Sequence, residues 1–305
     1  MKVLFFGTPD LSVPFLSWLS KNQSVVGVVT RADKPVGRGL EITAPPVKEF
    51  ATQNKIPVFQ PAGPWTPETV RQLKDLNADV GIVVAYGRIL PRDVFMAPRL
   101  GCINIHFSLL PKYRGAAPIQ WSLINGDTKS GASAFWLEEG LDSGPLFAQK
   151  EIPIALSDNE GTLREKLIQC GLEVLGSVMK DLSAGRIVKN PQQGEVVMAP
   201  QLQKESSLID WNKPAENILN LIRGISEWPV ARTSGGIKIF KASYAGPTEA
   251  RHSPGTIVGM EKDRGYLIQT GDGRVLIEEV QPPGKKRMSA WAYIQGARLN
   301  VDEKI

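Results

Sequence analysis

Hydrophobic residues in the first half of the chain gather in short continuous runs. Residues 3–6 are apolar and end at the turn residues Gly7, Thr8 and Pro9. Further runs lie at residues 24–29, 78–85, 102–106 and 132–137. Short apolar runs bounded by turn residues predict strands, and the nearly all-apolar run at 78–85 predicts a strand covered on both faces.

Between these runs the hydrophobic spacing changes to that of a helix. Val13, Phe15, Leu16 and Leu19 recur at helical intervals, and residues 161–182 predict one long helix. Thr162 and Glu165 form a candidate capping box at its start. Alternating strands and helices predict an α/β fold, with a mostly parallel sheet and helices on both faces. Ligands of such sheets bind beyond the carboxyl ends of the strands.

The C-terminal part of the chain has a different pattern. Residues 217–222 predict a helix, and Gly271, Asp272 and Gly273 predict a hairpin turn. Short predicted strands lie at residues 237–240, 255–258, 266–269 and 274–280. Short strands separated by frequent turns predict a small antiparallel β-barrel. We therefore expect a first domain at residues 1–189, a linker at 190–207 and a barrel domain at 208–305.

Composition narrows the class of protein. The chain has 305 residues, a length that suggests two domains. Of these residues 42% are hydrophobic and 22% are charged, as is typical of soluble globular proteins. Its apolar runs are shorter than the ~18 residues of a membrane span, and the N-terminal run is too short for a signal peptide. We therefore expect a cytoplasmic protein without membrane contact.

Cysteine, histidine and charge add further limits. Two cysteines and two histidines make a disulfide scaffold or a multi-histidine metal site implausible, so we expect no metal. A net charge of +5 is compatible with a polyanionic partner such as nucleic acid.

Two polar side chains lie on one predicted strand. Asn104 and His106 are two residues apart, so strand alternation places them on the same face. An amide donor beside an imidazole at the end of a strand is a plausible oxyanion site. Both residues also have purely structural interpretations, because a lone histidine is often a packing residue and an asparagine can simply end a strand.

A carboxylate follows the next predicted strand. Asp142 lies in the Gly-rich turn of residues 138–145, which in a parallel sheet would lie beside the loop after His106. There it would favour the imidazolium form and orient the ring. Asp142 could instead be an ordinary turn residue. Cys102 is an alternative nucleophile, although a cysteine inside an apolar strand usually packs.

These residues resemble the signature of the formyltransferases that use 10-formyltetrahydrofolate, and within them the members that act on methionyl-tRNA. The signature combines Asn104 and His106 with the loop 108–111 and the turn 140–145. Similarity extends over nearly the whole chain, at residues 6–9, 38–39, 45–48, 84–87, 228–229 and 284–288. The resemblance implies a Rossmann-like catalytic domain followed by an oligonucleotide-binding-like barrel. We expect a monomer.

The resemblance also implies roles for particular residues. Asn104, His106 and Asp142 would be catalytic. Folate, as the formyl donor, would contact Tyr86, Gly87, Arg88, Ile89, Leu90, Ser108, Leu109, Leu110, Pro111, Leu137, Glu138, Glu139 and Gly140. The initiator tRNA would contact Arg31, Lys34, Arg38, Lys48, Lys285, Lys286 and Arg287.

Four other functions compete with this interpretation of the sequence. The first domain would serve equally in a formyltransferase that acts on an amino sugar nucleotide. A glycinamide ribonucleotide formyltransferase usually has one domain, so residues 208–305 argue against it. In a formyltetrahydrofolate hydrolase, water would replace the amine. A non-catalytic RNA-binding protein is disfavoured by the intact set of Asn104, His106 and Asp142.

Overall fold

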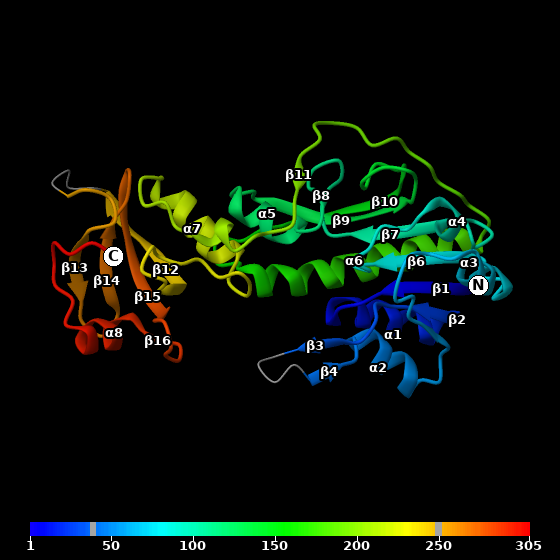
Figure 1. The fold of residues 1–305 in the computed structure, drawn as a ribbon. Helices are drawn as coiled ribbons and strands as arrows, with labels where there is room; N and C mark the ends of the chain where they lie inside the picture. The colour runs from blue at the N-terminus through cyan, green and yellow to red at the C-terminus, as the bar shows by residue number, and fades with distance from the viewer. Residues whose placement is uncertain (37–40, 248–251) are drawn as a thin grey trace. The chain divides into compact units, whose positions relative to one another are not determined.

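The chain folds into two compact units that are not continuous in sequence. The structure, a computed structural model, describes residues 1–36, 41–247 and 252–305 (Figure 1). The first unit comprises Met1–Ala116, Ser130–Pro153 and Glu165–Ala199, and the second comprises Ala117–Lys129, Ile154–Arg164 and Pro200–Ile305. The predicted boundaries at residues 189 and 208 stay a prediction.

The core of the first unit is a seven-stranded sheet in the order β10-β9-β7-β6-β1-β2-β5. Its strands are β1 (Lys2–Gly7), β2 (Ser24–Val29), β5 (Val58–Phe59), β6 (Val80–Val84), β7 (Cys102–His106), β9 (Lys129–Trp136) and β10 (Leu146–Pro153). The pairs β1–β2, β1–β6, β2–β5 and β6–β7 are parallel, whereas β7–β9 is antiparallel. The prediction of a mostly parallel α/β sheet is confirmed.

Helices cover both faces of this sheet. They are η1 (Asp10–Ser12), α1 (Val13–Asn22), α2 (Pro46–Gln53), α3 (Pro67–Asp75), α4 (Arg92–Phe95) and α6 (Glu160–Ser183). On one face, Leu73 of α3 and Val94 of α4 pack in a buried cluster with Leu4 of β1. On the other face, α6 approaches so closely at Gly171 that a Cβ there would lie 2.9 Å from the Phe15 ring of α1.

Several local features differ from the sequence prediction. Helix α6 begins at Glu160, and its capping pair is Asn159 with Thr162, whose backbone and side chains exchange hydrogen bonds of 3.0 Å. The predicted capping box of Thr162 and Glu165 is therefore wrong. Unpredicted two-stranded pairings join β3 (Lys34–Val36) to β4 (Glu41–Thr43) and β8 (Arg114–Gly115) to β11 (Met198–Ala199).

The second unit contains a five-stranded antiparallel sheet. Its strands are β12 (Lys238–Pro247), β13 (Ile257–Glu261), β14 (Gly265–Gln269), β15 (Gly273–Gln281) and β16 (Met288–Ser289). Its helices are α5 (Pro118–Ile124), η2 (Glu205–Ser207), α7 (Ala215–Gly224) and α8 (Ala290–Ala297). The prediction of a C-terminal antiparallel β domain is confirmed, and each of its four predicted strands overlaps an observed one.

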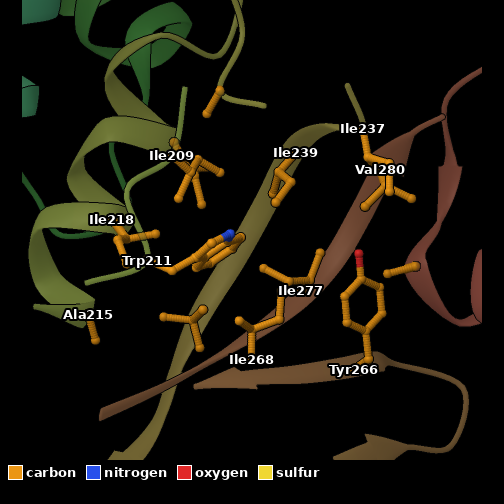
Figure 2. Close-up of a cluster of buried hydrophobic side chains, with 14 of the residues drawn as sticks. Ile209, Trp211, Ala215, Ile218, Ile237, Ile239, Tyr266, Ile268, Ile277 and Val280 are labelled. Atoms are coloured by element: carbon orange, nitrogen blue, oxygen red, sulfur yellow. The ribbon is translucent and has the colours of Figure 1, made fainter. Parts of the chain in front are cut away.

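Isoleucines from several elements form the core of the second unit. Ile218 of α7 faces Ile239 of β12, Ile268 of β14 and Ile277 of β15, with Trp211 beside them (Figure 2). Alternation in the strands places these side chains on one face of the sheet, where α7 covers them. None of the helices formed by residues 1–36, 41–247 and 252–305 combines the length and the apolar character that a membrane crossing needs.

Candidate active site

Asn104 and His106 lie on β7, next to the antiparallel strand β9. Asn104 pairs with Val83 of β6 and with Phe135 of β9, and His106 lies opposite Ser133. Asn104 is half-buried, whereas His106 is 6% exposed and meets the Phe135 ring edge-to-face. Because the run 102–106 is a regular strand, both side chains project from the same face, as the spacing predicts.

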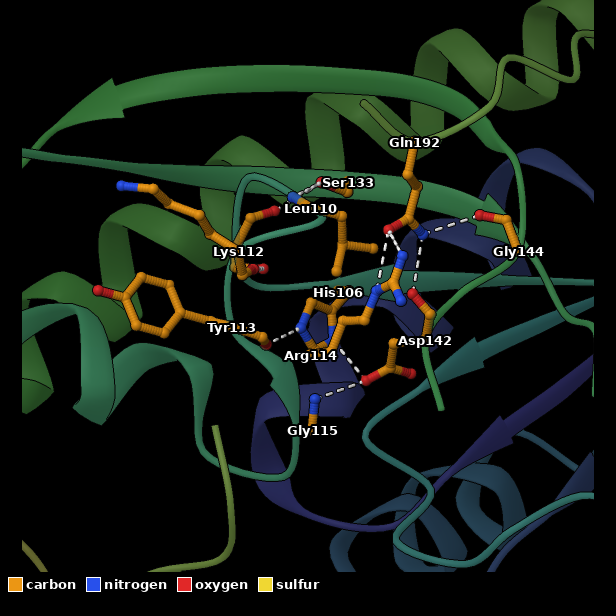
Figure 3. A network of polar contacts seen from close by, with 11 residues as sticks. His106, Leu110, Lys112, Tyr113, Arg114, Gly115, Ser133, Asp142, Gly144 and Gln192 are labelled. Atoms are coloured by element: carbon orange, nitrogen blue, oxygen red, sulfur yellow. Dashed lines mark hydrogen bonds and ion pairs between the residues drawn. The ribbon is translucent and has the colours of Figure 1, made fainter. Parts of the chain in front are cut away.

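The contacts of the His106 ring distinguish its two nitrogens. Nε2 lies 2.8 Å from the carbonyl oxygen of Tyr113, and Nδ1 lies 3.7 Å from Oδ2 of Asp142 (Figure 3). A carbonyl oxygen only accepts, so Nε2 must carry a hydrogen. The Nδ1–Oδ2 distance is too long for a hydrogen bond but within ion-pair range. Nδ1 is therefore the nitrogen left to meet a substrate.

Asp142 is held in a turn by the backbone. Its φ is +48°, in the left-handed region that aspartate tolerates better than most residues. Its Oδ2 accepts a hydrogen bond of 2.8 Å from the Gly115 amide, and its side chain is 14% exposed. The carboxylate is thus fixed between the backbone of Gly115 and the ring of His106.

Asp142 reaches His106 by a route that the sequence did not predict. The two strands were expected to be parallel, with their following loops side by side. Instead β9 runs antiparallel to β7, so that its last residue, Trp136, lies opposite Ile103. The chain then folds back, with the Trp136 amide donating to the Pro145 carbonyl at 3.0 Å. The predicted proximity is confirmed, but the predicted reason for it is wrong.

The loop after His106 is held by internal hydrogen bonds. The buried Ser108 hydroxyl donates to the Lys112 carbonyl at 2.6 Å, and the Ser133 hydroxyl donates to the Ser108 carbonyl at 2.6 Å. The Leu110 amide donates to the Ser133 hydroxyl at 3.2 Å. Leu110 and Pro111 are buried and Leu109 is half-buried. The loop predicted to contact folate therefore has a fixed shape.

The predicted folate loop at 86–90 follows β6. Tyr86 is buried against Phe6 and Trp65, and burial raises the pKa of its hydroxyl. Arg88 lies 5.8 Å above the Trp65 ring. Gly87 has a φ of +78°. Two residues later, the side chain of Ile89 faces solvent and is 88% exposed. Leu90, in contrast, is buried.

The arginine of this loop is already engaged. Arg88 donates to the carbonyl oxygens of Pro61 and Gly63 at 2.8 and 2.7 Å. It therefore ties the loop to residues 61–63 of the same unit.

The segment before Asp142 begins buried and becomes exposed. The Leu137 amide donates to the Cys102 carbonyl at 2.8 Å, and its side chain packs against the cluster beneath α3 and α4. Glu138, Glu139 and Gly140 are exposed, and Glu139 pairs with Arg92 at 3.6 Å. Only Leu137 of this predicted set offers a fixed apolar surface.

The basic residues predicted to bind tRNA differ in their environments. In the first unit, Arg31 is half-buried and Lys34 is exposed on β3. Lys48 forms a 2.6 Å ion pair with Asp33, whose carboxyl pKa is lowered by hydrogen bonds from Gln60 and Lys48. Arg38 lies outside the described residues.

The second-unit candidates also differ. Lys285 and Lys286 are exposed. Arg287 makes two hydrogen bonds of 2.5 Å to Glu279 and lies 4.2 Å above the Phe240 ring. Lys285 and Lys286 therefore remain the stronger candidates for phosphate contacts in this cluster.

The geometry disfavours Cys102 as a nucleophile. Cys102 is buried among apolar side chains, and burial raises the pKa of its thiol, so the alternative nucleophile is disfavoured. Across the three described stretches of chain, no group of three or more His, Cys, Asp or Glu residues is arranged to hold a metal ion.

Two residues at the site were missed by the sequence analysis. Arg114 donates to the side-chain oxygen of Gln192, and the Gln192 amide donates to the carbonyls of Asp142 and Gly144. Gln192 falls in the predicted linker, where no pattern marked it. Arg114 lies three residues beyond the signature loop 108–111, and nothing in the sequence distinguished it from a surface cation.

The sequence matches one known family over most of its length. Residues 1–179 match the formyl transferase family, and residues 201–298 match the formyl transferase C-terminal domain. The chain belongs to the formyl transferase family.

Proteins similar to this chain include methionyl-tRNA formyltransferases. The chain is 42% identical over 302 residues to that of Thermodesulfovibrio yellowstonii, covering 98% of this chain and 96% of that protein. It is 41% identical over 311 residues to that of Ruminiclostridium cellulolyticum, covering 100% and 99%.

Solved structures share the fold at lower identity. The N-formyltransferase of Helicobacter canadensis, in complex with folinic acid and dTDP-3-aminofucose, has a TM-score of 0.67 and 19% identity. The alignment covers 91% of this chain and 98% of that one. At this identity the likeness supports the fold alone.

Proposed function

We propose that the protein transfers the formyl group of 10-formyltetrahydrofolate to the α-amine of initiator methionyl-tRNA. The observation that carries this proposal is the similarity of 41–42% over essentially the full chain to proteins named methionyl-tRNA formyltransferase, which includes the C-terminal domain. Formylation of initiator tRNA serves translation initiation, so we expect the protein in the cytoplasm.

The geometry of the site suits an acyl transfer through an oxyanion. The methionyl amine attacks the formyl carbon, and the formyl oxygen gains negative charge. The bond between that carbon and N10 of the folate then breaks, and N10 takes up a proton in place of the one that the attacking amine loses, which gives tetrahydrofolate. The Asn104 amide would donate a hydrogen bond to the formyl oxygen, and so would His106 Nδ1 in the imidazolium form, in which both ring nitrogens carry a hydrogen. His106 Nε2 is engaged by the Tyr113 carbonyl, so only Nδ1 can serve. One such donor typically contributes about 10²–10³ in rate.

Asp142 would act on protons and charge. Its carboxylate faces His106 Nδ1 at 3.7 Å, where it would stabilise an imidazolium and accept a proton from the attacking amine. Proton-transfer groups contribute about 10²–10⁴ in rate. The proposed steps use neither a metal nor a covalent enzyme intermediate.

Folate would bind between the loop of residues 86–90 and the loop of residues 108–111. The fixed loop of residues 108–111, the exposed side chain of Ile89 and the apolar surface of Leu137 belong to the same unit as His106. Folinic acid bound to the Helicobacter canadensis relative is consistent with a tetrahydrofolate donor. The tRNA would bind through phosphate contacts from Lys34, Lys285 and Lys286, which are exposed.

The alternative acceptor is an amino sugar nucleotide, as the dTDP-3-aminofucose complex of the same relative indicates. The deciding experiment mixes the protein with 10-formyltetrahydrofolate and either methionyl-tRNA or UDP- and dTDP-amino sugars. We expect formylation of methionyl-tRNA alone. Formylation of a sugar amine but not of methionyl-tRNA would contradict the proposal. His106→Ala serves as the inactive control.

A further inference from the structure

We propose that Gln192, together with Arg114, is a positioning residue of the active site. Its side-chain amide joins the turn that carries Asp142 to the turn that orients His106. The predicted effect of Gln192 on turnover rests on the proposed function. The predicted effect of Gln192 on the geometry of His106 is independent of it.

The Gln192 amide uses all of its hydrogen-bonding capacity. Nε2 donates to the carbonyl oxygens of Asp142 and Gly144, both at 2.8 Å (Figure 3). Oε1 accepts from Nε and Nη2 of Arg114 at 3.1 and 2.7 Å. A primary amide has two donor hydrogens and two acceptor lone pairs, so every one is matched.

These contacts fix which end of the amide points where. If the amide were rotated, its oxygen would face two carbonyl oxygens and its nitrogen would face the guanidinium. Both arrangements are repulsive, so the observed orientation is the one that the neighbours permit. A glutamate at this position would still accept from Arg114, but its second oxygen would meet the carbonyls of Asp142 and Gly144 without a hydrogen to donate.

Both turns that Gln192 joins contain a residue in the left-handed region. Tyr113, with φ +64°, presents its carbonyl to His106 Nε2, and Arg114 follows it directly. Asp142, with φ +48°, presents its carboxylate to His106 Nδ1. This conformation is uncommon for non-glycine residues, and contacts from the surrounding structure help to hold it. Gln192 supplies such a contact to the carbonyl of Asp142 itself.

The segment that carries Gln192 is anchored on both sides. Before it, the Asn190 backbone exchanges hydrogen bonds of 2.9 and 2.7 Å with Leu146. After it, Met198 and Ala199 of β11 pair in parallel with Arg114 and Gly115 of β8. The half-buried side chain therefore starts from a fixed backbone, as a positioning residue requires.

The matched control is the neighbouring glutamine. Gln193 has the same side chain, lies one residue further along and is exposed. The variants to compare are Gln192→Ala, Gln192→Glu and Gln193→Ala. Gln192→Glu is close to isosteric and preserves an acceptor for Arg114, so it removes mainly the bonds to the Asp142 turn.

The first measurement is the ring ¹⁵N spectrum of labelled histidine at one pH, because these shifts report tautomer and hydrogen bonding. The chain has two histidines, His106 and His252, so His252 is an internal reference. The second measurement is turnover with KM for both substrates. We expect both Gln192 variants to shift the His106 signals and to lower kcat about 10- to 100-fold with little change in KM. Gln193→Ala should match the wild type.

Unchanged His106 signals in a folded Gln192→Glu protein would overturn the proposal, whatever its turnover. Shifted signals with wild-type turnover would also overturn it. Failure of Gln192→Glu to fold would show that the amide supports the whole unit rather than the site. If the wild-type protein formylates no amine, the proposed function fails, and the His106 signals still decide whether Gln192 positions that ring.

Discussion

Gly144 leaves no space for a side chain in the turn that carries Asp142. A Cβ at this position would lie 1.8 Å from the carbonyl oxygen of Trp136. That backbone is fixed by the hydrogen bond between Trp136 and Pro145. We expect Gly144→Ala to lower the free energy of unfolding by roughly 3 kcal/mol in denaturant titrations.

The control for this substitution is Gly63→Ala in the same unit. A Cβ at Gly63 would have no atom within 4 Å. Its unfolding midpoint should stay close to that of the wild type. A Gly144→Ala protein as stable as the Gly63→Ala protein would show that the turn can shift. It would contradict the conclusion that the backbone of this turn holds Asp142 in a fixed position.

Cys102 lies on the same strand as Asn104 and His106 but packs in the apolar cluster. Burial raises the pKa of its thiol, so the nucleophilic thiolate is scarce near neutral pH. We expect Cys102→Ala to have a turnover close to that of the wild type, with a stability loss of about 1 kcal/mol. Loss of turnover in a folded Cys102→Ala protein would restore the nucleophile hypothesis.

Among the elements, α7 has a cap supplied from a distant turn. Pro214 precedes the helix and gives no side-chain cap, and the Ala215 amide instead donates to Oδ1 of Asp272 at 2.8 Å. We expect Asp272→Ala to reduce stability by about 1 kcal/mol, whereas Asp272→Asn should retain most of it because asparagine also caps helices. Thermal unfolding of both variants is the measurement. An Asp272→Ala protein as stable as the wild type would mean that the cap contributes nothing.

The sequence predicts the elements better than their pairing. β7 and β9 were recognisable because both are apolar runs, but an apolar run does not reveal the direction in which a strand enters a sheet. The same limit applies to β3 and β4, which are short, and whose exposed Glu41, Ile42 and Thr43 show no buried face. The proximity of Asp142 to His106 was therefore expected for a reason that the antiparallel β7–β9 pair contradicts.

The site was predictable only where its residues lie close in sequence. Asn104 and His106 are two residues apart, and strand alternation alone places them together. Gln192 is 50 residues from Asp142 and 78 from Arg114. It stands among polar residues without periodicity, so only the folded backbone reveals it.

At the scale of the whole molecule, the net charge of +5 bears on the larger substrate. Binding of methionyl-tRNA should weaken with salt, by on the order of 100-fold between about 50 and 200 mM if about four phosphates are contacted. We expect Lys285→Ala to reduce the slope of log affinity against log salt by about 1. Lys262→Ala, an exposed lysine of the same unit, should leave the slope unchanged. Affinity that does not respond to salt would contradict phosphate contacts.

The most direct test of formyl transfer at this site is kcat at saturating 10-formyltetrahydrofolate and methionyl-tRNA for Asn104→Ala, His106→Ala and Asp142→Ala. Folding of each variant is first verified by its unfolding midpoint. We expect each to lose at least about 10²-fold in kcat, since each removes an oxyanion donor or a proton-transfer group. Turnover near that of the wild type in all three would contradict the assignment of the active site.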